Sequence, residues 1–120
     1  MQRRYANLLA LLLTAGLAAC NNDGEELGGL PDAPTELSAK LSASSGVILT
    51  WDDAADEQNY VVKRQSVGDD SGFVVIAELP ADTVEYTDIK VDSGKTYRYR
   101  VASENAYGEA TSAEVMIAVP

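Results

Sequence analysis

The chain has 120 residues, enough for one small domain, and its 19 acidic residues outnumber 9 Lys and Arg, giving a formal net charge of -10. Nucleic acid is excluded as an expected partner, because phosphate binding needs clustered Lys and Arg. His is absent and Cys occurs once, which excludes a disulfide within the chain and most catalytic or metal-binding constellations.

The first 19 residues have the parts of an export signal. Arg3 and Arg4 supply a positive start, and residues 8–19 form a nearly continuous apolar run. This run is too short to span the hydrocarbon core of a bilayer, which takes about 20 residues. We therefore expect residues 1–19 to be a cleaved signal peptide, which leaves seven bases and a net charge of −12 on the mature chain.

A short motif surrounds the single cysteine. It consists of Leu17, Ala18, Ala19 and Cys20, and it resembles the lipobox of bacterial lipoproteins. The resemblance implies that the Cys20 sulfur receives a diacylglycerol and that cleavage leaves Cys20 as an N-terminus acylated with chains such as palmitate. Two or three such chains anchor a protein firmly, since each buried methylene contributes about 0.8 kcal/mol. The alternative is an ordinary signal peptide followed by a cysteine that stands there by chance.

The residues after the cysteine indicate in which membrane the protein is anchored and how the domain is connected to it. Asn21 stands where enterobacterial lipoproteins of the inner membrane carry Asp, which favours the outer membrane of a bacterial cell envelope. Residues 20–33 are polar, acidic and rich in glycine, with no periodic apolar pattern to bury. We interpret them as the lipidated cysteine and a flexible linker that lifts the domain off the bilayer.

The sequence of residues 34–120 predicts an all-β domain. Short alternating apolar runs are separated by turn residues about every ten positions, which is typical of antiparallel sandwiches. The pattern fits an immunoglobulin-like seven-stranded antiparallel β-sandwich. The predicted strands cover residues 35–41, 46–52, 59–65, 73–78, 83–88, 96–103 and 112–118.

Alternation along these strands predicts which side chains fill the core. The opposite faces, which carry Asp52, Lys63, Arg98 and Arg100, suit contact with water. Alternatively, the two arginines form a ligand patch on the outer face. The residues that alternation assigns to the core are Val47, Leu49, Trp51, Tyr60, Val62, Tyr97, Tyr99 and Val101.

Several blocks of the folded region form a recognisable pattern. Pro34 stands at the entry to the first strand, and Trp51 ends the run Val-Ile-Leu-Thr-Trp. The strongest sign is the block 91–102, Val-Asp-Ser-Gly-Lys-Thr-Tyr-Arg-Tyr-Arg-Val-Ala, followed by Asn-Ala-Tyr-Gly at 105–108. In these blocks residues 34–120 resemble a fibronectin type III domain of the bacterial kind.

The resemblance implies structural roles for several residues. It assigns Tyr97 to the tyrosine corner, a ring packed in the core whose hydroxyl reaches backbone a few residues upstream. It also assigns Val91 to the core beneath that ring. The sequence departs from the family at Ser93, where Pro is common, while Gly94 still permits the turn. Tyr99 stands where antibody-type domains carry their second cysteine, which disfavours that branch.

Acidic loops are the candidates for chemistry. The carboxylates at positions 52–57 and 69–70 lack the ligand spacing of a dedicated calcium loop. A filled sandwich of this size offers no cleft for a pair of catalytic carboxylates. We therefore expect no enzyme activity, no metal and no cofactor, with calcium binding and hydrolysis as the minor alternatives.

The loops at the ends of a sandwich are the natural place for binding. Tyr107, in the loop 104–109, is the candidate contact for a protein or a sugar, unless this loop is only the family's ordinary turn with Gly108 at positive φ. We expect a membrane-anchored envelope lipoprotein with a single non-catalytic module that binds an unknown envelope protein or glycan, or acts as a spacer. The alternative is a carbohydrate-associated accessory or adhesion module, with Tyr107 and Trp51 as the rings that stack on sugars.

Overall fold

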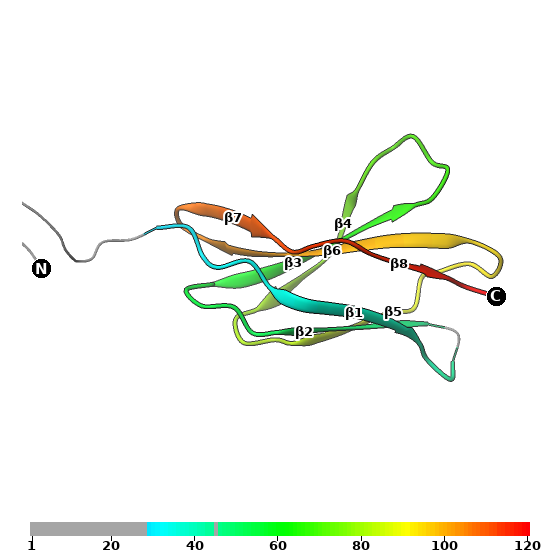
Figure 1. Ribbon diagram of the computed structural model, residues 1–120, viewed down its shortest axis with the longest axis horizontal. Coiled ribbons are helices and arrows are strands. Elements are labelled where there is room, and N and C mark those ends of the chain that lie inside the picture. The colour runs from blue at the N-terminus through cyan, green and yellow to red at the C-terminus, as the bar shows by residue number, and fades with distance from the viewer. Residues whose placement is uncertain (1–28, 45) are drawn as a thin grey trace, which may run out of the picture.

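The computed structural model describes residues 29–44 and 46–120. Within these ranges the chain forms two antiparallel β-sheets that pack face to face (Figure 1). The predicted signal peptide, Cys20 and most of the predicted linker lie outside the described residues. In the part of the chain that the structure describes, no helix is long and apolar enough to cross a membrane.

The predicted all-β sandwich is confirmed. The smaller sheet has the strand order β1-β2-β5, and the larger sheet has the order β4-β3-β6-β7, with β8 also paired to β6. The strands are β1 (Thr35–Leu41), β2 (Val47–Asp52), β3 (Asn59–Ser66), β4 (Val74–Pro80), β5 (Glu85–Asp88), β6 (Thr96–Asn105), β7 (Gly108–Thr111) and β8 (Val115–Ala118).

Inward-pointing side chains of both sheets fill the space between them. Along β2, Val47 and Leu49 are fully buried, and Trp51 is 4% exposed. The ring of Trp51 packs against that of Tyr60 on β3, with the centroids 5.7 Å apart. Burial of this apolar surface is the main stabilising contribution to the domain. The buried cluster of the described residues consists of Val47, Leu49, Trp51, Tyr60, Val62, Tyr97, Tyr99, Val101 and Val119, with the half-buried Val91 packed against it.

The last predicted strand, 112–118, corresponds to β8, and the structure adds an eighth strand, β7, that the prediction lacks. Both β7 and β8 pair with β6. The interruption between them lies at Ser112. Its backbone N–H donates to the Val101 carbonyl at 2.8 Å, while its side-chain hydroxyl accepts from the Val101 N–H at 3.0 Å. A side-chain oxygen therefore replaces the backbone acceptor of a regular ladder. β7 forms within the region predicted as a loop and the residues after it, because Gly108 pairs with Asn105 directly after the turn.

The strands run between two ends of the sandwich. We term the end that contains residues 29–32, 53–58, 81–84 and 105–108 the entry pole, and the end that contains residues 67–73 and 89–95 the far pole. In Figure 1 the entry pole lies on the left and the C-terminus lies on the right, beyond β8. The 10 residues of β6 extend from one pole to the other, which corresponds to about 33 Å of strand.

Candidate functional site

The chain enters the domain along the entry pole, where residues 29–32, the entry segment, contact two loops. The backbone N–H of Asp32 donates to the Ala55 carbonyl at 3.0 Å. The side-chain amide of Asn105 donates to the Gly29 carbonyl at 2.9 Å. These bonds fasten the entry segment to the sandwich, so the chain that precedes residue 29 meets the domain at this pole.

Tyr107 lies in the turn between β6 and β7, beside the entry segment. Its side chain is 64% exposed. The Tyr107 N–H donates to Asn105 Oδ1 at 2.8 Å, and Gly108 adopts a φ of 143°, a conformation that favours glycine. Asn105 and Gly108 thus shape the turn, and the same shape leaves the Tyr107 ring in solvent. The two interpretations of this loop are compatible with each other.

A hollow of about 320 Å³ lies next to Tyr107. Its lining includes Asn105 and the backbone of the entry segment at Gly29. Two acids, Asp56 and Glu57, and no base contribute to this lining. The hollow therefore suits a cationic or neutral polar group better than an anion.

Three carboxylates from two loops meet at the same pole. Asp53, Glu57 and Asp82 each place an oxygen within 4.8 Å of the others. The Tyr60 hydroxyl donates to Asp53 at 2.5 Å, and this hydrogen bond is the main cause that lowers the pKa of Asp53. The Asp82 N–H donates to Glu57 at 3.0 Å. Such oxygens are the ligands that hard divalent cations prefer, although hydrogen bonds within the protein already occupy part of their capacity.

The outer face of the larger sheet holds the two arginines of the alternative ligand patch. Arg98 and Arg100 both contact Glu114, at 3.1 Å each. The Arg100 guanidinium also lies 4.1 Å from the centroid of the Phe73 ring. One carboxylate is therefore shared by two cations on an exposed surface, where ion pairs stabilise a fold only weakly.

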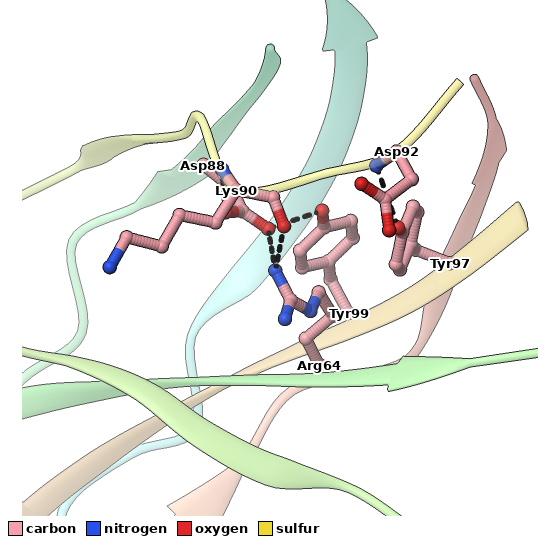
Figure 2. A network of polar contacts seen from close by, with 6 residues as sticks. All are labelled: Arg64, Asp88, Lys90, Asp92, Tyr97 and Tyr99. Atoms are coloured by element: carbon pink, nitrogen blue, oxygen red, sulfur yellow. Dashed lines mark hydrogen bonds and ion pairs between the residues drawn. The ribbon is translucent and has the colours of Figure 1, made fainter. Parts of the chain in front are cut away.

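A buried polar network joins the two sheets (Figure 2). Asp88, at the end of β5, is 2% exposed. Arg64 on β3 donates to Asp88 Oδ2 at 2.8 Å, and the Tyr99 hydroxyl on β6 donates to the same oxygen at 2.7 Å. The Lys90 N–H donates to the other oxygen at 3.0 Å. A single carboxylate of the smaller sheet thus binds two side chains of the larger sheet.

Burial and hydrogen bonding shift the pKa values of two members of this network, Arg64 and Tyr99. Burial lowers the pKa of Arg64, but the hydrogen bond and the charge of Asp88 outweigh burial and leave the pKa raised. Burial is the main cause that raises the pKa of the Tyr99 hydroxyl, and its hydrogen bond to Asp88 acts in the same direction. Arg64 therefore stays charged, and Tyr99 stays a neutral donor.

Next to this network, the Tyr97 hydroxyl accepts a hydrogen bond from the Asp92 N–H at 2.8 Å, the contact that the resemblance assigned to a tyrosine corner. Sequence reasoning placed Tyr99 in the core but missed its polar partners. A signal for one partner was present, because Arg64 follows Tyr60 and Val62 on the inward-facing side of β3. A charged side chain on that side requires a partner.

Comparisons with known proteins show which solved structures have a similar fold. No protein-family model matches the chain. The solved structure of a Fn3-like protein from Clostridium thermocellum is 32% identical, with a TM-score of 0.60, and the match covers 77% of this chain and 93% of that one. A pectate lyase from Erwinia chrysanthemi, solved in complex with tetragalacturonic acid, is 22% identical with a TM-score of 0.62, over 70% of this chain and 28% of that one.

A curated relative comes from vertebrate muscle. The M-protein of striated muscle from Gallus gallus is 27% identical over 90 residues, which are 72% of this chain. The chain spans only 6% of the length of that protein. This likeness therefore concerns one domain of a much larger molecule.

Proposed function

We propose, because the chain belongs to the fibronectin type III-like family, that it is an envelope lipoprotein whose single non-catalytic module binds a protein partner or serves as a spacer. The lipid on Cys20 would hold this module at a bacterial membrane, and Asn21, directly after the cysteine, favours the outer membrane. The fold itself supports the interaction or spacer role, since its rigid strands present loops and edges at fixed positions.

The hydrogen bonds that hold the entry segment on the sandwich are the observation that best supports the proposal. Gly29 is bound to the sandwich, and it follows Cys20 by only nine residues. A chain of this length reaches at most about 30 Å, at roughly 3.3 to 3.6 Å per residue. A lipid-linked Cys20 would therefore keep the entry pole, with Tyr107, within that distance of the bilayer. The far pole could extend outward by the length of β6.

The electrostatics of the described residues support a non-catalytic role. The pKa values of Asp53 and Arg64 are shifted, and both groups are bound within the fold: Asp53 accepts from Tyr60, and Arg64 donates to a carboxylate of the smaller sheet. Ion-pair and hydrogen-bond networks that hold a fold together perturb pKa values without taking part in catalysis. The carbohydrate-handling alternative is weakened, because Trp51, one of its two candidate rings, is in the core and only the other, Tyr107, is exposed.

Metabolic labelling with palmitate tests the anchor. Cells that produce the full chain are expected to incorporate the label into it, and Cys20→Ala is expected to abolish incorporation and release the protein from the membrane fraction. The matched control is Asn22→Ala, which lies two residues past the lipidation site and should label like the wild type. Incorporation that persists in Cys20→Ala would contradict the anchor.

A photocrosslinking amino acid at position 107 tests the interaction role. A partner at the entry pole should yield one reproducible crosslinked envelope protein from this position. The control position is Met116, whose side chain is 60% exposed on β8. Crosslinks that are equally diffuse from both positions would instead support a spacer.

A further inference from the structure

The lateral opening between β4 and β5 contains a hollow of about 450 Å³. Among the described residues, β4 pairs only with β3 and β5 pairs only with β2, so both strands have a free edge on this side. The volume falls within the range of about 300 to 1,000 Å³ that ligand pockets occupy. The lining residues that matter are Arg64, Ile76, Tyr86, Asp88, Ile89 and Lys90.

Arg64 brings unused hydrogen-bond donors to this hollow. Its Nη1 binds Asp88 at 2.8 Å and the Lys90 carbonyl at 3.0 Å. A guanidinium has five N–H donors, and no described residue accepts from Nε or Nη2. Figure 2 shows the second terminal nitrogen turned away from Asp88 and Tyr99. The side chain is 21% exposed and contributes to the lining of the hollow.

The charge of the lining distinguishes this hollow from two other hollows in the part of the chain that the structure describes. Arg64 and Lys90 outweigh Asp88 by one positive charge. The hollow at the entry pole has two acids and no base in its lining, and a third hollow at the far pole has one acid and one base. On a chain with a net charge of -10, a positive lining marks a place for a singly charged anion.

Apolar side chains form the rest of the lining. Ile76 and Tyr86 are half-buried, and Ile89 is 75% exposed. A ligand that covers Ile89 gains free energy from the apolar surface it removes from water. The hollow therefore fits a carboxylate attached to an apolar body, with guanidinium donors for the charge and isoleucine and tyrosine surfaces for the body.

We propose that this hollow binds the C-terminal end of an extended peptide whose last residue is apolar. The terminal carboxylate accepts hydrogen bonds from Arg64, and the last side chain covers Ile89 and Tyr86. The peptide backbone lies along the free edge of β5, since only a peptide can satisfy a strand edge with its own N–H and C=O groups. The edge of β4 is less suitable, because a register shift opposite Val62 and Lys63 interrupts it.

Lys90 contributes attraction at a distance. Figure 2 shows its ammonium pointing away from the guanidinium of Arg64, on a side chain that is exposed. This charge draws an anion toward the hollow without fixing its position, and salt screens the attraction. The inference rests on the proposed interaction role and names its partner class, but it does not depend on the lipid.

Titration followed by NMR tests the proposal with the chain from residue 20 on, carrying Cys20→Ser. This form retains the complete buried cluster of the described residues. The probes are the tripeptide N-acetyl-Ala-Val-Leu as the free acid and as the amide. The acid is expected to shift the signals of Tyr86 and Ile89 saturably, and the amide is expected to bind at least about tenfold more weakly, because it lacks the charge-assisted hydrogen bond.

Two variants separate the charge from the apolar contact. Lys90→Gln should weaken binding of the acid about two- to fivefold and leave the affinity for the amide unchanged. Added salt should have the same two effects on the wild type, because it screens the attraction between Lys90 and the carboxylate. Ile89→Ser should weaken the binding of both probes, because both cover the same apolar surface. The matched control for the charge is Lys40→Gln, an exposed lysine on β1 outside the lining, which should leave both affinities as in the wild type.

Three results would overturn the proposal. These are equal affinity for acid and amide, shifts centred on Tyr107 in place of Ile89, and no saturation by about 10 mM peptide, tenfold above the dissociation constant of a weak complex. Each of them leaves the palmitate labelling of Cys20 untouched. Conversely, loss of the anchor would not alter the titration, so the two failures are distinguishable.

Discussion

Removal of the Asp88 carboxylate probes the network that joins the two sheets. Asp88→Ala deprives Arg64 and the Tyr99 hydroxyl of their shared acceptor at a position that is 2% exposed. Breaking a buried pair by removing one partner costs about 3 to 5 kcal/mol, because the remaining charge is uncompensated. Arg64 keeps 21% exposure and its bond to the Lys90 carbonyl. The expected loss is therefore near the lower limit, about 3 kcal/mol.

Asp92→Ala is the matched control for this perturbation. Asp92 belongs to the same connection between β5 and β6, but its side chain is 73% exposed and its ion pair with Lys95 spans 3.8 Å. Exposed pairs contribute about 0 to 1 kcal/mol. Both variants remove one carboxylate, so the difference between them isolates burial and hydrogen bonding. A small domain has a total stability of about 5 to 15 kcal/mol, which makes a loss of this size easy to measure.

Urea denaturation followed by the fluorescence of Trp51 measures the two free energies of unfolding. Asp88→Ala should lower the midpoint by about 1 M or more with an unchanged slope, while Asp92→Ala should stay close to the wild type. If the two variants unfold within about 1 kcal/mol of each other, the network does not stabilise the sandwich as the geometry indicates.

Three further perturbations address the corner, the titration of a buried tyrosine and the entry-pole turn. Tyr97→Phe leaves a backbone N–H without its acceptor and should lower the free energy of unfolding by about 1 to 3 kcal/mol in the same assay, whereas Tyr107→Phe should not change it. The folded-state pKa of Tyr99 lies above its ordinary value of 10.0. The contribution of Tyr99 to the free energy of unfolding is therefore complete below pH 10 and is lost as the pH rises from there through the folded-state pKa. Stability should fall in alkaline solution, and Tyr99→Phe, but not Tyr107→Phe, should flatten that fall. Gly108→Ala places a side chain at a φ of 143° and should lower the melting temperature by an amount equivalent to about 1 kcal/mol or more, while Gly29→Ala, with open space around it, should be neutral.

Most of the sandwich could be predicted from local patterns. The direction of a side chain in a strand follows from a two-residue period, which is why the sequence alone assigns Trp51, Tyr97 and Tyr99 to the core. The break between β7 and β8 has no such local signal. It depends on the hydroxyl of Ser112 meeting the N–H of Val101 across the sheet, and that is a tertiary contact.

The candidate sites were predicted less completely, because they too depend on tertiary contacts that leave no local signal in the sequence. The turn residues around Tyr107 indicate an exposed loop, but they do not indicate that Gly29 is bound there. Asp82 and Glu57 are 25 residues apart in the chain, and Arg64 and Asp88 are 24 apart. Such pairs form only when loops and sheets are placed relative to one another.

Intact-mass spectrometry of the protein purified from bacterial membranes shows whether the module is held there by a lipid. The expected species begins at Cys20 and carries the added mass of a diacylglycerol and an N-linked acyl group. A chain without lipid that begins at another residue, or one that retains residues 1–19, would contradict the lipid anchor.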